Sequence, residues 1–483
     1  DQKRVAARLV EASAAYTAQT DYEIGRILDA LERTGQLKNT LTICIIGDNG
    51  ASMEGTPYGA FNELAALGGI PEDPAYVLQR LDDIGGPRAY NHYPVGWAWA
   101  MNTPFQWGKQ VASHLGGTRN PLVIAWPDRI RDAGGTRGQF HHVIDIAPTI
   151  LMAAGIPQPT EVNGVKQKPI EGVSMIYSFD NANAAEARKV QYFELLGNRG
   201  IYVDGWLASA RHGRLPWIGG IGSSVSFDDD KWELYDLRSD FTQYDDVAAK
   251  YPQKLKELQD VFWIEAENYQ VLPLDDRLSE RFNPALRPSL IAGRTVFDYY
   301  PGSRIPDSSA APTQNRSHTI TAYLEVPKGG ADGVLAAVGG TVGGFSLFVK
   351  DGRPVYEYNL GSLQRTTIKG AEALKPGQNV VRVEFRYDGG GLGKGANVSL
   401  FVNDSKVGEG RINATNWIGK YSADETFDIG EDSGSPVSDE YVAPSRFSGT
   451  IKKVVIDVQP ANLTAADLQR QQVAERAATL MLQ

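Results

Sequence analysis

The texture of the sequence changes once, near a Pro-containing stretch at 273–288, and this change sets the domain organisation. Before it, helical patterns alternate with short apolar runs. After it, short segments of alternating polar and apolar residues follow one another, separated by Gly-containing turns. The first texture is typical of an α/β fold and the second of an antiparallel β-sandwich. We therefore predict two domains, at 1–280 and 281–483, the second ending in a helix.

The first 160 residues carry the α/β signal. Apolar residues recur at helical spacing up to about Arg33. The short apolar runs 41–46 and 122–126 are each typical of a strand buried on both faces, as in a parallel sheet. A helix is predicted at 143–154, ending at a Gly-Ile-Pro stop. We expect the parallel sheet to lie within about 1–160.

An antiparallel subdomain is predicted to follow at about 185–270. Two runs over 190–204 predict a hairpin, and 232–237 predicts a third antiparallel strand. A helix over 251–268 closes this part of the chain.

Composition excludes several classes of protein. The net charge is −10, and no dense run of Lys and Arg points to nucleic acid as a partner. No apolar run approaches the roughly 18 residues that a membrane span needs. The single cysteine, Cys44, excludes a disulfide within the chain and a zinc site built from several thiolates. Its apolar neighbours predict a buried strand residue.

Asp48 and Asn49 follow the first predicted strand directly. Ligands of α/β sheets bind just beyond the carboxyl ends of strands. A carboxylate beside an amide carbonyl offers two hard oxygen ligands, which suit Ca²⁺ or Mg²⁺. Asp-Asn-Gly is also a common turn sequence, and both interpretations stay open on these residues alone.

Lys109 and His114 precede a paired-glycine turn at Gly116 and Gly117. The lysine could present its ammonium to an anionic group, and the glycines let the backbone pass close to a ligand. His114 could donate a proton or a hydrogen bond. A solvated lysine and a structural histidine are the alternatives for these two residues.

Several motifs in a fixed order resemble the sulfatase family, within the alkaline phosphatase-like superfamily. The resemblance covers about residues 5–265, and the insert between Asp48 and Lys109 looks like the bacterial arylsulfatase branch. The matching segments are 20–26, 45–50, Lys109, 116–121, 143–156, and 232–237 with Asp240. The resemblance implies the C-terminal part of an alkaline phosphatase-like sulfatase domain with a small antiparallel sheet, followed by a β-sandwich.

What the resemblance implies for the site can be stated residue by residue. The positions of Asp48 and Asn49 bind Ca²⁺, and that of Lys109 contacts the sulfate ester. We add His114 as a second candidate catalytic residue. Here the chain departs from the family pattern, because the glycine turn is one residue longer and His114 and Leu115 replace the usual residues before it.

The family nucleophile is a formylglycine made from the Cys or Ser of a Cys/Ser-x-Pro-x-Arg motif, and this sequence contains no such motif. The nucleophile and two further acidic metal ligands would come from an upstream region. We therefore expect the chain to be a fragment or a processed product that begins near the middle of the sulfatase domain and is inactive alone. The resemblance also favours a periplasmic or extracellular location.

The activity implied is hydrolysis of a sulfate monoester on a small molecule or a glycan. Two alternatives remain open at this stage. One is hydrolysis of a phosphonate monoester or phosphodiester within the same superfamily. The other is a non-catalytic pseudoenzyme whose lectin-like β-sandwich binds a glycan.

Overall fold

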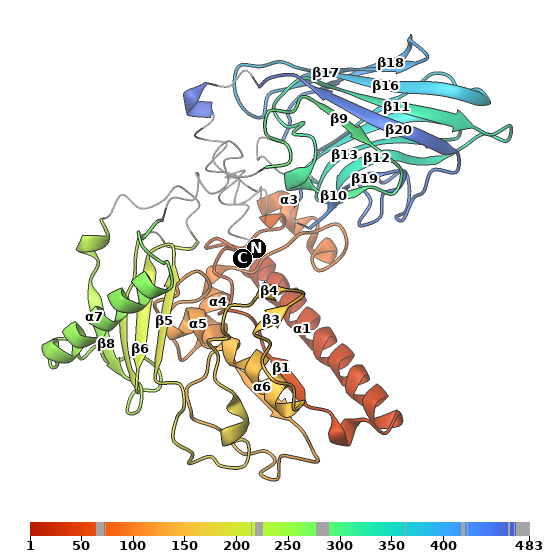
Figure 1. Cartoon of the computed structure of the whole chain (residues 1–483). Coiled ribbons are helices and arrows are strands. Elements are labelled where there is room, and N and C mark those ends of the chain that lie inside the picture. The colour runs from red at the N-terminus through yellow and green to blue at the C-terminus, as the bar shows by residue number, and fades with distance from the viewer. Residues whose placement is uncertain are drawn as a thin grey trace.

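The protein is seen here as a computed structural model of the 483-residue chain. It describes residues 1–63, 72, 74–213, 215–217, 226–276, 289–362, 364–416, 421–422, 424–461, 464–467 and 469. Figure 1 shows three groups of elements: a helical and irregular part around α1, a small sheet covered by α7, and a β-sandwich. None of the described helices is both long and apolar enough to cross a membrane.

The chain begins with one long helix, α1 (Gln2–Arg33), as the apolar spacing predicts. Leu9 is its fully buried residue, and it packs in a small core with Phe61, Val77 and Ile84. The partners of Leu9 come from the long segment between the first two strands. Burial of Leu9 therefore attaches the start of α1 to that segment.

The strands β1 (Thr42–Ile45) and β2 (Leu122–Ala125) pair antiparallel, from Thr42 opposite Ala125 to Ile45 opposite Leu122. The expected parallel arrangement is wrong for this pair, because short apolar runs indicate a strand without indicating its direction. The expected burial on both faces is also wrong. Within the described residues Val123 is 54% exposed, Ile45 is 43% exposed and Cys44 is only half-buried.

The segment between β1 and β2 holds short helices joined by irregular backbone. Two isolated bridges, Ala60 to His92 and Asn62 to Tyr90, fold it back on itself. Among its described residues, the helical elements are α3 (Pro74–Leu78), η2 (Leu81–Asp83), α4 (Val95–Asn102) and α5 (Leu115–Thr118). The described residues of this segment are thus held together by local bridges and small cores.

The predicted helix at 143–154 is confirmed as η3 (Val143–Asp145) followed by α6 (Ile146–Ala153). Asp145 is fully buried and forms an ion pair with Arg188, which ties this helix to the chain that follows. Three short elements lie between them: β3 (Glu161–Val162), β4 (Val165–Lys166) and η4 (Met175–Ser178).

The predicted antiparallel part is a sheet in the order β5-β6-β7-β8, four strands among the described residues. The hairpin is confirmed as β5 (Val190–Leu195) and β6 (Asn198–Val203), and the later strand as β8 (Trp232–Asp236). The sequence analysis missed β7 (Trp206–Ala210). The helix α7 (Pro252–Asn268) covers one face, and its Phe262 packs on Ile201 and Leu234. A short helix, η5 (Phe227–Asp229), precedes β8.

The C-terminal part is a β-sandwich, as predicted, with two sheets that each hold six described strands. One has the order β10-β19-β12-β13-β14-β15 and the other β18-β17-β16-β11-β20-β9, all with antiparallel neighbours. The elements are β9 (Val296–Tyr299), β10 (Arg304–Pro306), η6 (Asp307–Ser309), β11 (His318–Val326), β12 (Gly333–Gly340), β13 (Gly343–Lys350), β14 (Arg353–Leu360), β15 (Gln364–Lys369), β16 (Gly377–Tyr387), β17 (Ala396–Val402), β18 (Ser405–Ile412), β19 (Thr426–Ile429) and β20 (Thr450–Val458).

Neither end of the predicted second domain is fully covered by described residues. The boundary near residue 280 lies outside the described residues, as does almost all of the predicted C-terminal helix. The sandwich does contact the first part of the chain. The Asn62 side chain donates to the carbonyl oxygens of Val342 (3.2 Å) and Gly361 (3.0 Å), and Tyr90 donates to Asp424 (2.8 Å).

We predict that residues 289–461, expressed alone, fold into a stable domain. The main core of the sandwich is built from residues between Phe297 and Val458 and closes without the first 280 residues. Circular dichroism should show β structure and one cooperative thermal transition. A broad, non-cooperative melt of this piece, with a cooperative one for the whole chain, would contradict a separate domain.

Candidate functional site

The turn that follows β1 carries the two predicted metal ligands. Gly47 takes a positive φ of 84°, which reverses the chain after Ile46. Asp48 is exposed, Asn49 is half-buried and Gly50 is buried. The turn is therefore anchored at Gly50, with the carboxylate-bearing residue on the solvent side.

Backbone packing brings this turn against the segment that contains Lys109. The Gly50 amide donates to the Gly117 carbonyl (3.1 Å), and the Lys109 amide donates to the Ala51 carbonyl (3.1 Å). A Cβ atom on Gly50 would lie 1.6 Å from the Gly116 carbonyl oxygen, so only glycine fits at this position. The structure thus places the backbone after Asn49 beside that of Lys109, although 61 positions separate Asp48 from Lys109 in the sequence.

The paired glycines lie against the chain's own backbone. Their expected closeness to a ligand stays a prediction. A Cβ atom on Gly116 would lie 2.1 Å from the Gln106 carbonyl oxygen, and one on Gly117 would lie 2.3 Å from that of Val111. These glycines let α5 pack against the chain's own backbone. They hold the loop around Lys109 in a compact form.

The Lys109 ammonium lies 3.3 Å from Oε2 of Glu54. Both side chains are largely buried, with exposed fractions of 14% for Lys109 and 3% for Glu54. The Gln110 amide also donates to this carboxylate, at 2.6 Å from Oε1. Glu54 is therefore a counter-ion of the lysine, and the sequence analysis did not identify it.

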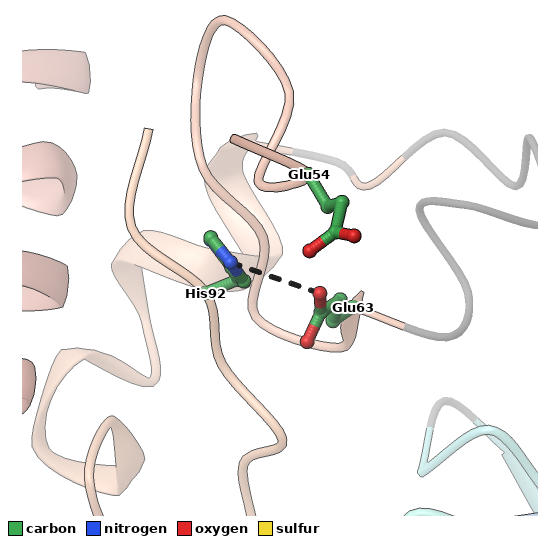
Figure 2. Close-up of side chains that lie close together, drawn as sticks. All are labelled: Glu54, Glu63 and His92. Carbon is green, nitrogen blue, oxygen red and sulfur yellow. Dashed lines mark ion pairs between the residues drawn. The ribbon is translucent and has the colours of Figure 1, made fainter. Parts of the chain in front are cut away.

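Glu54 belongs to a second group of side chains that the sequence analysis also missed. Oxygen or nitrogen atoms of Glu54, Glu63 and His92 lie within 4.8 Å of one another. Figure 2 shows the three side chains pointing toward one another, with an ion pair of 3.8 Å between His92 and Glu63. The three residues come from separate stretches of irregular chain, where no periodic pattern could indicate that they meet.

The surroundings of Glu63 and His92 favour the uncharged form of each side chain. Burial, together with the nearby charge of Glu54, raises the pKa of Glu63 to about 8, although Lys109 opposes the shift. Burial also lowers the pKa of His92. Both changes follow from the cost of placing a charge where little water reaches it.

His114 lies at a different contact from Lys109. It stands immediately before α5, is 2% exposed, and places Nε2 3.2 Å from the Glu233 carboxylate of β8. Its Nδ1 lies 2.9 Å from the Ser113 hydroxyl. The hydrogen bond from His114 lowers the pKa of Glu233. The observed contacts of His114 therefore join α5 to the antiparallel sheet, and its catalytic role stays a prediction.

The donor chemistry of Asp48 and Asn49 suits Ca²⁺. Calcium takes 6–8 oxygen ligands, and this turn supplies carboxylate and amide oxygens on a backbone fixed by Gly50. Asp48 is exposed and so accessible to an ion from solvent. Two side chains are a partial shell, and water or other oxygen donors would complete it.

Comparison with known proteins finds a family match for the first third of the chain. Residues 1–156 match the sulfatase family. An uncharacterized sulfatase of Schizosaccharomyces pombe is 30% identical over 292 residues, which cover 59% of this chain and 49% of that protein. An arylsulfatase of Klebsiella aerogenes is 28% identical over 36% of each chain.

A third relative is an N-acetylglucosamine-6-O-sulfatase of Bacteroides thetaiotaomicron, 27% identical over 29% of this chain and 23% of that protein. The matched part of this chain therefore spans about half the length of the first relative and less of the other two.

We predict that Gly50→Ala lowers the free energy of unfolding by about 3 kcal/mol or more, because the new methyl group would collide with the Gly116 carbonyl. Gly25→Ala is the matched control, since Gly25 lies within α1 and a Cβ atom added there would have no neighbour within 4 Å. The control should be neutral or stabilise by up to about 1 kcal/mol. Urea denaturation measures both, and equal stabilities of the two variants would contradict the close packing.

We predict that Lys109→Met lowers the free energy of unfolding by about 2–3 kcal/mol, because it leaves the buried Glu54 carboxylate without its ammonium partner. The Lys109→Met/Glu54→Gln double variant should recover at least half of the loss. Urea denaturation of the single and double variants at pH 7 measures this coupling. Strictly additive losses would show that the two side chains do not interact.

Proposed function

We propose, on the premise that residues 1–156 match the sulfatase family, that the protein hydrolyses a sulfate monoester. The observation that carries the proposal is the packing of the Asp48–Asn49 turn beside the backbone of Lys109. A metal-binding turn and a cation on one surface are what a sulfuryl group needs, since its oxygens carry the charge that must be stabilised.

In this proposal Asp48 and Asn49 hold Ca²⁺, which would act as a Lewis acid on the sulfate ester. Lys109 supplies a second positive charge for the sulfuryl oxygens. Glu54 holds its ammonium 3.3 Å away in this structure. Binding of a sulfate ester would therefore draw the lysine away from Glu54 or share it between the two anions.

The nucleophile is assigned to a formylglycine outside these 483 residues. A sulfate ester is poorly reactive toward water, and a covalent step on an activated nucleophile divides the reaction into two easier ones. His114 is a candidate for the proton that the leaving oxygen requires. Its present partner, the Glu233 carboxylate, lies 3.2 Å from Nε2 and orients the imidazole.

We further propose a carbohydrate sulfate as the substrate class. One relative acts, by its name, on an N-acetylglucosamine 6-O-sulfate. The β-sandwich contacts the segment that carries Glu54 and Glu63 through Asn62. A sandwich in this position could bind the rest of a glycan while the sulfated end enters the site.

We predict that the 483-residue chain alone does not hydrolyse 4-nitrophenyl sulfate, because its sequence contains no Cys/Ser-x-Pro-x-Arg motif. The reading frame that encodes it, expressed with its upstream sequence and the formylglycine-generating enzyme, should hydrolyse this ester. In that longer protein, Lys109→Ala should lower kcat/KM by about 10²–10³-fold.

The matched control in the longer protein is Lys38→Ala, which changes a lysine of η1 (Leu37–Asn39) near the far end of β1. Turnover by the 483-residue chain that disappears in Lys109→Ala would contradict the assignment of the nucleophile. Faster hydrolysis of bis(4-nitrophenyl) phosphate than of the sulfate ester by the longer protein would replace the sulfatase proposal with a phosphodiesterase.

A further inference from the structure

The group formed by Glu54, Glu63 and His92 is separate from the turn of Asp48 and Asn49. Each of its residues offers one ligand atom, and these atoms lie within 4.8 Å of one another. Octahedral and tetrahedral ligand shells with bonds of about 2.1 Å place their ligand atoms about 3–4 Å apart. Small shifts of side-chain torsions would therefore bring all three atoms onto one ion.

The backbone around the group is fixed before any ligand arrives. Ala60 and His92 exchange two backbone hydrogen bonds of 2.9 Å, and the Glu63 amide donates to the Tyr90 carbonyl (2.8 Å). A Cβ atom on Gly55 would lie 2.1 Å from Nδ1 of His92, so the chain next to Glu54 packs directly on the imidazole. Contacts of the backbone therefore hold the three residues near one another.

The imidazole of His92 is oriented as a ligand. Its Nδ1 lies 2.7 Å from the Tyr93 carbonyl oxygen, which can only accept, so Nδ1 carries the hydrogen. In the neutral ring Nε2 then presents a lone pair, and it lies 3.8 Å from Glu63 Oε1 and 2.7 Å from the Ser52 hydroxyl. A backbone carbonyl that fixes the other ring nitrogen is the usual support of a metal-bound histidine.

The group has more hydrogen-bond acceptors than hydrogens to satisfy them, which points to a further positively charged partner. The Ser52 hydroxyl has one hydrogen and lies between two acceptors, Nε2 of His92 and the Glu54 carboxylate. It can satisfy only one of them. Two carboxylates lie here with exposed fractions of 3% for Glu54 and 13% for Glu63, and Lys109 supplies one positive charge to Glu54. A proton or a metal ion would complete the balance.

We propose that Glu54, Glu63 and His92 bind one divalent transition-metal ion, of the Zn²⁺ or Mn²⁺ type, at a site distinct from that of Asp48 and Asn49. One imidazole and two carboxylates suit these ions, whereas Ca²⁺ takes oxygen ligands almost exclusively. The ion would lie beside Lys109 and would compete with its ammonium for Glu54. The proposal is independent of sulfate ester hydrolysis, because it concerns binding by the 483-residue chain itself.

The test is isothermal titration calorimetry of the metal-free 483-residue chain with ZnCl₂ and, separately, MnCl₂ at about pH 7.5. The ligand side chains must lose their protons when they bind the ion. We expect one ion per chain for at least one of them, with protons released on binding. Glu63→Gln, which keeps the size of the side chain, and His92→Asn should each weaken binding by at least about 100-fold, more than the loss of a supporting residue. Co²⁺ should give visible absorption bands in the wild type that disappear in Glu63→Gln.

Two control variants separate this site from other acidic and histidine groups. His141→Gln removes a histidine that pairs with Asp145 at 3.3 Å, and it should bind Zn²⁺ as the wild type does. Asp48→Ala should keep the Zn²⁺ site while losing any binding of Ca²⁺. Circular dichroism checks that each variant is folded, and Glu63→Gln alone decides the outcome if His92→Asn is not.

The proposal is overturned if the wild-type chain binds neither Zn²⁺ nor Mn²⁺ more tightly than Glu63→Gln does. Absence of metal binding together with pH-dependent stability that Glu63→Gln abolishes would identify a shared proton in place of the ion. Loss of Zn²⁺ binding in Asp48→Ala with retention in Glu63→Gln would move the ion to the turn after β1.

Discussion

The contact between Gly50 and the Gly116 carbonyl is the constraint on which the candidate site depends. It leaves no room for a Cβ atom and draws two distant segments into backbone contact. The hydrogen bonds from Gly50 to Gly117 and from Lys109 to Ala51 follow from that contact. Asn102 adds to it, because its side chain accepts from the Ala51 amide and donates to the Trp107 carbonyl, both at 2.9 Å. These contacts of the backbone therefore fix the position of Lys109.

This local order contrasts with the surroundings of β1 and β2. The sandwich buries a large core of its own. In contrast, Ile46, which follows β1, and Val123 of β2 are each 54% exposed. Exposed apolar side chains on both a sheet and its neighbouring helices are unusual for a surface in water. In the helix α1, Tyr22 and Ile27 are also exposed, with exposed fractions of 67% and 62%. The candidate site is therefore built on glycine packing and ion pairs more than on a deep apolar core.

The sequence predicted the elements better than their arrangement. Helical spacing located α1 and α7, and alternation over short segments indicated a β-sandwich, because these patterns are repeated over many residues. The direction of β2 could not be predicted, since four residues carry no signal for it. The strand β7 was missed because Ala and Ser fill all but one of its buried positions, in place of the larger apolar residues that mark a strand.

Motif spacing pointed to Asp48 and Lys109, and the structure brings the backbones of their two segments together. It gave no sign of Glu54 as the partner of Lys109, nor of the approach of Glu63 and His92. These contacts depend on two isolated bridges in irregular chain, where neighbours in space have no regular separation in sequence. The sequence identified His114 as a candidate residue. Its contact with Glu233 could not be predicted, because 119 positions separate the two residues.

The bridge segments that carry Glu63 and His92 also touch the sandwich. Asn62, next to Glu63, donates to the carbonyls of Val342 and Gly361, and Tyr90, two positions before His92, donates to Asp424. Any ligand that moves one of these segments must therefore strain or relieve the contact between the two parts of the chain. By reciprocity, a molecule that binds the sandwich and shifts Val342 or Asp424 would change the affinity of that ligand by the same factor. The irregular loop would then act as an allosteric coupling between the β-sandwich and the site beside Lys109.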